Sequence, residues 1–171
     1  AHSYAYINGI AATVFRFFTV YGPWGRPDMA LFKFTKGILN SEPIDVFNHG
    51  DMYRDFTYVD DLVESIRRLV SAIPDVTKKV STKDNLSPVA PFRIVNIGNS
   101  SKIRLLDFIE AIESELGMKA IKNNLPMQKG DVPATWADAT LLEELTNFKP
   151  STDYKEGVQN FVRWYKAYYG V

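Results

Sequence analysis

Apolar and polar residues follow two different periodicities along the chain, and segments of each kind are interleaved. Residues 12–22, ATVFRFFTVYG, are rich in β-branched and aromatic side chains and stop at a Gly-Pro pair, which predicts a buried strand followed by a loop. Further strands are predicted at 43–48 (PIDVFN), 54–59 (RDFTYV) and 92–99 (FRIVNIGN), with a turn at 48–51. Because strands and helices alternate, the chain is predicted to form a mixed α/β fold.

Helical spacing of apolar residues marks most of the remaining segments. Residues 29–39, MALFKFTKGIL, predict a helix, and Asp60 and Asp61 stand where the N-cap of the next helix is expected. Thr140 and Glu143 have the spacing of a capping box before a short helix. The apolar stripes of three helical segments are Leu62, Ile66, Leu69 and Ile73; Leu105, Phe108, Ile109, Ile112 and Leu116, with a stop at Gly117; and Val158, Phe161, Val162, Tyr165 and Tyr169, with a stop at Gly170.

Composition narrows the class of protein. The chain has 171 residues, 46% of them hydrophobic and 13% aromatic, which suits one domain with a proper core. Its 20 basic and 20 acidic residues cancel, so neither a nucleic acid nor a membrane surface is expected as a partner. There is no cysteine, which is compatible with a cytoplasmic location, and the two histidines are far apart, so no metal site is expected. Residues 74–91 are rich in Lys, Ser and Pro, and we interpret them as an exposed loop.

The loop after the first strand carries the clearest candidate chemistry. Arg26 stands between Gly25 and Pro27, and we interpret the backbone of this loop as stiff on both sides of Arg26. A guanidinium fixed in this way suits bidentate recognition of a carboxylate, and Thr19 offers a hydroxyl at the end of the strand. The alternative is a surface ion pair between Arg26 and Asp28.

Four motifs then occur in a fixed order: RxFxxYGP at 16–23, RDFxYVDD at 54–61, NIGN at 96–99 and GDVxxTxAD at 130–138. Together they resemble the C-terminal half of extended short-chain dehydrogenase/reductase enzymes that act on nucleotide sugars, most closely the UDP-glucuronate 4-epimerase family. The resemblance implies an α/β fold that contains the last strands of a Rossmann sheet and a small mixed α/β substrate-binding domain. Residues 1–30 would end the Rossmann part and carry the substrate loop, and residues 31–171 would form the substrate-binding lobe with returning Rossmann elements.

The resemblance also implies roles for single residues on the sugar and phosphate side. Positions matching Thr19 and Arg26 hold the sugar carboxylate, and the position matching Arg54 contacts the diphosphate. For Arg54 the alternative is a salt bridge with Asp55 or Asp51 on the surface of its strand.

Other implied roles concern the nucleoside and the cofactor. The position matching Asp131 contacts the ribose, and Phe47 lines the base, for which simple core packing is the alternative. Gln128 stands where some relatives have an arginine on phosphate, so Lys129 or Lys33 would have to replace that cation. Phe17 and Phe18 belong to the strand core, and in relatives one of them borders the nicotinamide of NAD.

Two motifs of such enzymes are not found in these 171 residues. No GxxGxxG can be drawn through the ten glycines, and no tyrosine has a lysine four residues later. We therefore expect the catalytic residues to lie upstream of this chain, and the chain alone to lack epimerase activity and not to bind NAD. The whole enzyme would bind a UDP-sugar and NAD and form a homodimer, and the chain alone would self-associate through its first strand.

Two other hypotheses stay open from the sequence. A sibling enzyme, such as a nucleotide-sugar dehydratase, a decarboxylase or a neutral UDP-hexose epimerase, would share these motifs. A non-catalytic module that binds sugar nucleotides would share the binding residues without the chemistry.

Overall fold

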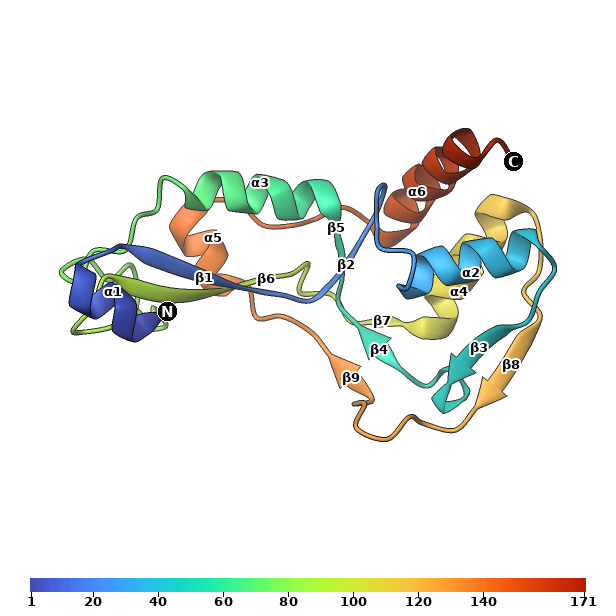
Figure 1. Cartoon of the computed structure of the whole chain (residues 1–171), viewed down its shortest axis with the longest axis horizontal. Helices are drawn as coiled ribbons and strands as arrows, with labels where there is room; N and C mark the ends of the chain where they lie inside the picture. Colours follow the sequence, from blue (N-terminus) through green and yellow to red (C-terminus); the bar gives the residue numbers. More distant parts are fainter.

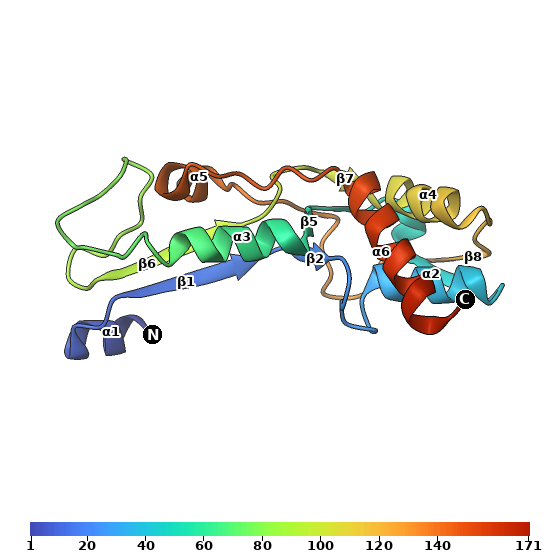
Figure 2. The same ribbon diagram turned by 90° about the horizontal axis from the view of Figure 1, so that it is seen from above.

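The computed structural model describes all 171 residues, which form an elongated molecule with two parts joined by several crossing segments (Figure 1). The first part, here called the Rossmann part, is built on β1 (Ala12–Phe17) and β6 (Phe92–Ile97), which pair in parallel. Helices α3 (Val59–Leu69) and α5 (Thr140–Thr146) pack together beside this pair, and α1 (His2–Asn8) precedes it (Figure 2). None of the helices combines the length and the apolar character needed to cross a membrane.

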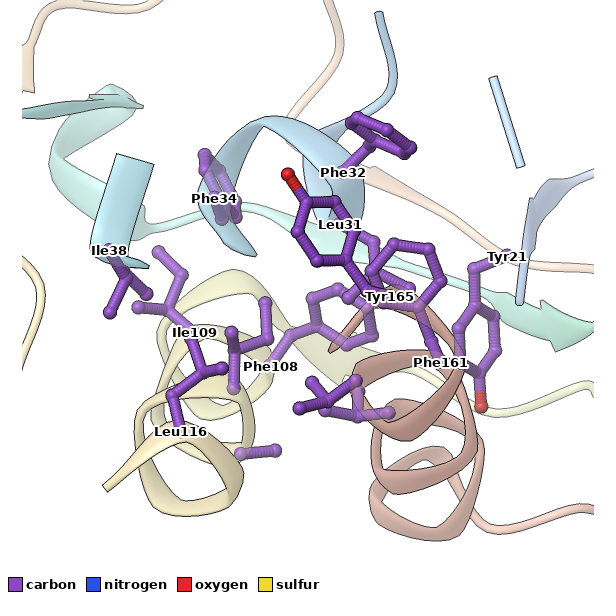
Figure 3. Packing of buried hydrophobic residues seen from close by; sticks show 14 of the residues in the cluster. Tyr21, Leu31, Phe32, Phe34, Ile38, Phe108, Ile109, Leu116, Phe161 and Tyr165 are labelled. Carbon is purple, nitrogen blue, oxygen red and sulfur yellow. The ribbon is translucent and has the colours of Figure 1, made fainter. Parts of the chain in front are cut away.

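The second part, here called the lobe, is held together by three helices. Helices α2 (Ala30–Leu39), α4 (Leu105–Leu116) and α6 (Tyr154–Tyr169) bury their apolar stripes against one another, as Figure 3 shows for residues such as Phe32, Ile109 and Phe161. The rings of Phe56 and Phe108 stack at 3.8 Å between centroids in this cluster. All three helices occupy the segments that the spacing of apolar residues predicts, so burial of an apolar stripe is what organises the lobe.

Short strands complete the lobe. β3 (Ile44–Phe47) pairs in parallel with β8 (Lys122–Leu125), and a short 3-10 turn η1 (Asn48–Gly50) follows β3. β4 (Tyr53–Arg54) lies between β7 (Ile103–Arg104) and β9 (Ala134–Thr135), antiparallel to β7 and parallel to β9. The periodicity predicted β3, but it did not predict α1, β7, β8 or β9, because the two-residue strands and the polar β8 carry no alternation long enough to detect.

Two segments that were each predicted as a single strand, 12–22 and 54–59, are divided between two strands in the structure. β1 ends at Phe17, and after Phe18 the chain continues as β2 (Thr19–Tyr21), which pairs in parallel with β5 (Phe56–Tyr58) instead of with β6. The segment 54–59 is likewise divided at Asp55 into β4 and β5. The prediction of single strands was wrong because an apolar run reports burial but not which strand is the partner. β1 is also half-buried to exposed along its length, with only β6 beside it.

The predicted starts and stripes of two helices need correction. α3 is preceded by Tyr58 as its N-cap, so Asp60 and Asp61 lie in its first turn, where negative charge favours the helix. Ile73 lies beyond the end of α3 at Leu69 and is exposed. The predicted capping box of Thr140 and Glu143 is absent, since Thr140 is the first residue of α5.

Hydrogen bonds to two aspartates lie near these helix starts. The Asp138 carboxylate accepts from the backbone N–H of Thr140 at 3.0 Å and from its hydroxyl, so the capping oxygen comes from two residues earlier. The Asp61 carboxylate accepts from the backbone N–H groups of Ser151 and Thr152, which ties α3 to the segment before α6.

The segment 74–91 is less exposed than its composition suggests. Asp84 is buried and makes a bidentate pair with Arg93 on β6, with both N–O distances at 2.9 Å. Burial alone would raise the pKa of the Asp84 carboxyl, but hydrogen bonds from Arg93 and from the amides of Val80 and Leu86 outweigh it and lower that pKa. Leu86 and Ala90 are buried as well, so this segment is anchored to the Rossmann part. The segment is a loop with many exposed residues, as predicted, but it is not exposed throughout.

A second buried carboxylate, Glu113 on α4, makes stability depend on pH. Its oxygens accept from Lys119, from Lys122 and from the amide of Ala120. Burial opposes ionisation, but these donors outweigh it and lower the pKa of Glu113 from 4.5 to about 2. Because the folded pKa lies below the unfolded one, this stabilisation is complete above about pH 4.5 and is lost as the pH falls toward 2.

We expect Glu113→Gln to lower the free energy of unfolding at pH 7 and to flatten its decrease between pH 5 and pH 3. Urea denaturation at pH 7, 5, 4 and 3 measures this. Glu110→Gln is the matched control, because Glu110 is exposed on the same helix and its carboxylate accepts no hydrogen bond. Equal slopes for the Glu113→Gln variant and the unmodified chain would contradict the expectation.

Candidate functional site

Two adjoining pockets lie along β2 and the loop that connects β2 to α2. The first is lined by Thr19, Gly25, Arg26 and Met29 among others, and the second by Phe17, Phe18 and Arg26 with parts of the same loop. Four of the predicted site residues therefore gather around the segment 22–29, and Arg26 lines both pockets. Phe17 is half exposed and Phe18 is less so, and both border the second pocket rather than a closed strand core.

The path of this loop requires a glycine at its start. Gly22 has φ of 137°, and a Cβ at this position would lie 2.7 Å from Cγ1 of Val59 and 3.2 Å from the ring of Tyr58. Only glycine accepts this conformation and this close approach to α3. The N–H of Gly25 donates to the carbonyl of Gly22 at 3.2 Å, so the chain turns sharply just before Arg26.

Arg26 lies at the tip of the loop and is paired with Asp28. Its Nε donates to Oδ1 of Asp28 at 3.0 Å and its Nη2 to Oδ2 at 2.5 Å, and the side chains are 76% and 57% exposed. The hydrogen bond from Arg26 lowers the pKa of the Asp28 carboxyl. This is the ion pair that the sequence offered as an alternative. Because both side chains of this pair are largely exposed, a carboxylate on a ligand can compete for the same guanidinium.

Arg54 and Asp131 meet although they are far apart in the sequence. Nη2 of Arg54 donates to Oδ1 of Asp131 at 2.8 Å, and the side chains are 19% and 34% exposed. Nη1 of Arg54 donates to the carbonyl of Tyr53, which fixes the guanidinium against its own strand. The pairing of β4 with β9 brings the two residues together. Salt bridges from Arg54 to Asp55 or Asp51 are not formed, so that alternative was wrong.

A further pocket lies on the other side of α2. Phe47 and Gln128 line it together with Lys33, Asp28 and Asp45. The structure thus brings the predicted base-side residue Phe47 close to Gln128 and supplies a nearby cation in Lys33, whereas Lys129 is not among the lining residues. No group of three or more His, Asp or Glu side chains is arranged to hold a metal ion.

One structurally important residue was missed from the sequence. The carboxylate of Asp55, between β4 and β5, is fully buried and pairs with no cation. It accepts from the backbone N–H groups of Asn99 at 2.9 Å, Ser100 at 2.9 Å and Ala137 at 3.0 Å. The signal was an acidic residue inside an apolar strand, which requires buried donors. Asp55 joins the end of β6 and the segment after β9 to the strand that carries Arg54.

Comparison with known sequences adds independent information. A sequence profile of the NAD dependent epimerase/dehydratase family matches residues 1–98. A probable UDP-glucuronate 4-epimerase of Rhizobium meliloti is 55% identical over 172 residues, which cover 99% of this chain and 50% of that protein. UDP-glucuronate 4-epimerase 4 of Arabidopsis thaliana is 43% identical over 99% of this chain and 39% of its own length. The chain therefore spans about half the length, or less, of the curated relatives it matches.

Solved structures agree with the expected fold. A UDP-glucuronic acid 4-epimerase from Bacillus cereus, solved with UDP-glucuronic acid and NAD, superposes with a TM-score of 0.78 at 30% identity. The superposition covers 94% of this chain and 47% of that chain. The predicted fold class, an α/β arrangement with the last Rossmann strands and a small mixed lobe, is confirmed.

Proposed function

Because the chain belongs to the NAD dependent epimerase/dehydratase family, we propose that it is the UDP-sugar-binding half of a UDP-glucuronate 4-epimerase. The observation that carries this proposal is the position of Arg26 and Thr19, a guanidinium and a hydroxyl on one pocket at the end of β2. A cation and a hydroxyl in this place suit the carboxylate of a uronic acid better than a neutral sugar. The identities with relatives named as such epimerases support the same substrate.

The remaining site residues each contact a different part of the nucleotide in this proposal. Arg54, mostly shielded from solvent and held by Asp131 and by its own strand, supplies the positive charge for the diphosphate. Asp131 keeps a second carboxylate oxygen for ribose hydroxyls. Phe47 offers a ring beside the base, and Lys33 offers the cation that Gln128 does not. We assign residues 1–30 to the end of the Rossmann part with its substrate loop, and residues 31–171 to the lobe with its returning Rossmann elements.

The carboxylate contact has a chemical purpose in this reaction. NAD, when bound, would supply the hydride chemistry at C4 of the sugar. A 4-keto uronic acid is a β-keto acid, which loses CO2 readily when the bond to the carboxylate aligns with the ketone π system. Arg26 and Thr19 hold the carboxylate so that this bond stays out of alignment, and the sugar keeps its carboxyl group.

The residues of this chain do not form a complete NAD site. A dinucleotide needs a glycine-rich turn between a strand and a helix to receive its pyrophosphate, and none of the strand-to-helix turns described above has that sequence. Phe17 and Phe18 border a pocket and suit only the edge of a nicotinamide. The proposal is therefore that the chain alone binds UDP-sugars weakly and has no epimerase activity. A cytoplasmic location and self-association through the exposed Phe17 region belong to the same proposal.

We expect Arg26→Ala to remove the preference for UDP-glucuronate over UDP-glucose, with a roughly tenfold or larger loss of UDP-glucuronate affinity and little change for UDP. Calorimetry with the three ligands measures this. Arg163→Ala is the control, since Arg163 is exposed on α6 and makes no ion pair. In a complete enzyme containing this chain, the Arg26→Ala variant should also release a decarboxylated pentose product.

Two results would contradict the proposal. An unmodified chain that binds UDP-glucuronate and UDP-glucose equally well would favour a sibling enzyme for neutral sugars. An Arg26→Ala variant that keeps the preference would place the carboxylate elsewhere.

A further inference from the structure

An exposed group of aromatic rings connects the substrate loop to the last helix. Trp24 contacts Trp164 with ring centroids 5.3 Å apart and Tyr168 with centroids 5.1 Å apart. Trp164 and Tyr168 stack on each other at 5.4 Å and 21°. We call these three residues the aromatic clasp. It joins the segment before Arg26 to the C-terminal turns of α6.

The backbone of Trp24 is held in an unfavourable conformation. Its φ is +61°, in the left-handed region that bulky residues rarely occupy. The side chain is 72% exposed, so burial in the core does not offset this strain. Strained residues persist only where other contacts determine their conformation, and the contacts of Trp24 with Trp164 and Tyr168 are of that kind.

Apart from Gly22, which packs closely against Val59 at the start of α3, the loop has little else to fix it in place. The hydrogen bonds of residues 22–28 stay within the segment 22–29, from Gly25 to Gly22, from Met29 to Arg26 and from Arg26 to Asp28. Such bonds define the shape of the loop but not its position relative to the lobe. The indole N–H of Trp164 is buried without a hydrogen-bond partner, so ring packing alone holds that side of the clasp.

We propose that Trp164 and Tyr168 are positioning residues that hold Trp24 and thereby set where the guanidinium of Arg26 stands over its pocket. The inference rests on the proposed function, because the consequence of positioning is selection of a carboxylated sugar. Helix α6 lines the pockets around Arg26 only through Phe161, which belongs to the first of them. Its contribution to specificity is therefore indirect and acts through the position of the loop.

The first test is independent of any ligand. Tyr168→Ala is compared with Tyr169→Ala, since Tyr169 is the adjacent tyrosine on α6, is also exposed, and contacts Phe32, Tyr165 and Tyr168 but not Trp24. Indole N–H signals of the three tryptophans are recorded by NMR and assigned by single Trp→Phe variants. Only Tyr168→Ala should shift the Trp24 signal and increase its mobility, and Trp136 should not change in either variant. A Trp24 signal that is the same in both variants overturns the clasp.

The second test measures selectivity with the same two variants. Tyr168→Ala should reduce the preference for UDP-glucuronate over UDP-glucose by roughly two- to tenfold, the range for losing an aromatic pair, while affinity for UDP is unchanged. Tyr169→Ala should keep the preference. A mobile Trp24 with full preference overturns the positioning role but leaves the proposed function intact. An unmodified chain without any preference overturns the proposed function, and the positioning role with it, even where the Trp24 signal shifts.

Discussion

UDP is expected to bind about thirtyfold more weakly, or about 2 kcal/mol, when Arg54 is replaced by alanine. Arg54 is mostly shielded from solvent and is oriented by Asp131 and by the carbonyl of Tyr53. Its loss removes the positive charge at the diphosphate and leaves the carboxylate of Asp131 facing an anion. The loss should be the same for UDP, UDP-glucose and UDP-glucuronate, because the diphosphate is common to all three.

Two comparison variants sharpen this measurement. Arg104→Ala removes an exposed arginine from β7, directly opposite Tyr53 in the ladder, and should leave UDP affinity almost unchanged. Adding Asp131→Asn to Arg54→Ala should restore part of the affinity, since the repulsion between carboxylate and phosphate is removed. Calorimetry with UDP gives all three values. A dissociation constant for Arg54→Ala equal to that of the unmodified chain would place Arg54 outside the site.

The free energy of unfolding should fall by about 3 kcal/mol or more in Asp55→Ala. The substitution removes the acceptor of three backbone amides, those of the part-buried Asn99, the exposed Ser100 and the buried Ala137. An amide left unpaired in a buried place costs about 1–3 kcal/mol, so Ala137 should contribute most. Domains of ordinary stability have only about 5–15 kcal/mol in total, so part of the population should unfold at 37 °C.

Urea denaturation at pH 7 measures this effect. Asp51→Ala is the control, because Asp51 is exposed four residues earlier and its carboxylate accepts no hydrogen bond. Asp55→Asn keeps one acceptor oxygen and should lie between the two. A change of less than about 1 kcal/mol in Asp55→Ala would mean that water replaces the carboxylate at these amides.

Helices and core could be predicted from periodicity because one face of each helix is buried. The stripe from Leu105 to Leu116 is buried apart from the half-buried Leu105, and that from Val158 is buried as far as Tyr165. Tyr169, which was predicted to end the second stripe, is exposed, so the prediction was wrong at that position. Strand partners could not be predicted in this way. The local sequence around Phe18 does not indicate that the residues before it pair with β6 and those after it pair with β5. Pairing is decided by segments tens of residues away, which a local pattern does not contain.

The site was predicted one residue at a time, and its geometry was not. Motif resemblance named Arg54 and Asp131 separately, but their ion pair depends on β4 lying beside β9. Asp84 and Asp55 were overlooked for a related reason, since a carboxylate in a polar-looking segment or a short motif gives no sign of its buried donors. Composition predicts average exposure, whereas burial of one acid depends on which amides surround it.

The parallel pairing of β1 with β6 and of β3 with β8 also bears on how the polypeptide folds. In each pair the partners are roughly eighty residues apart, as with Ala12 and Phe92 or Ile44 and Lys122. Closing such long loops costs entropy before any contact is gained, so folding should be slow and governed by these distant pairings. During synthesis β1 and β3 emerge well before their partners, and their unpaired edges are then open to association with other chains.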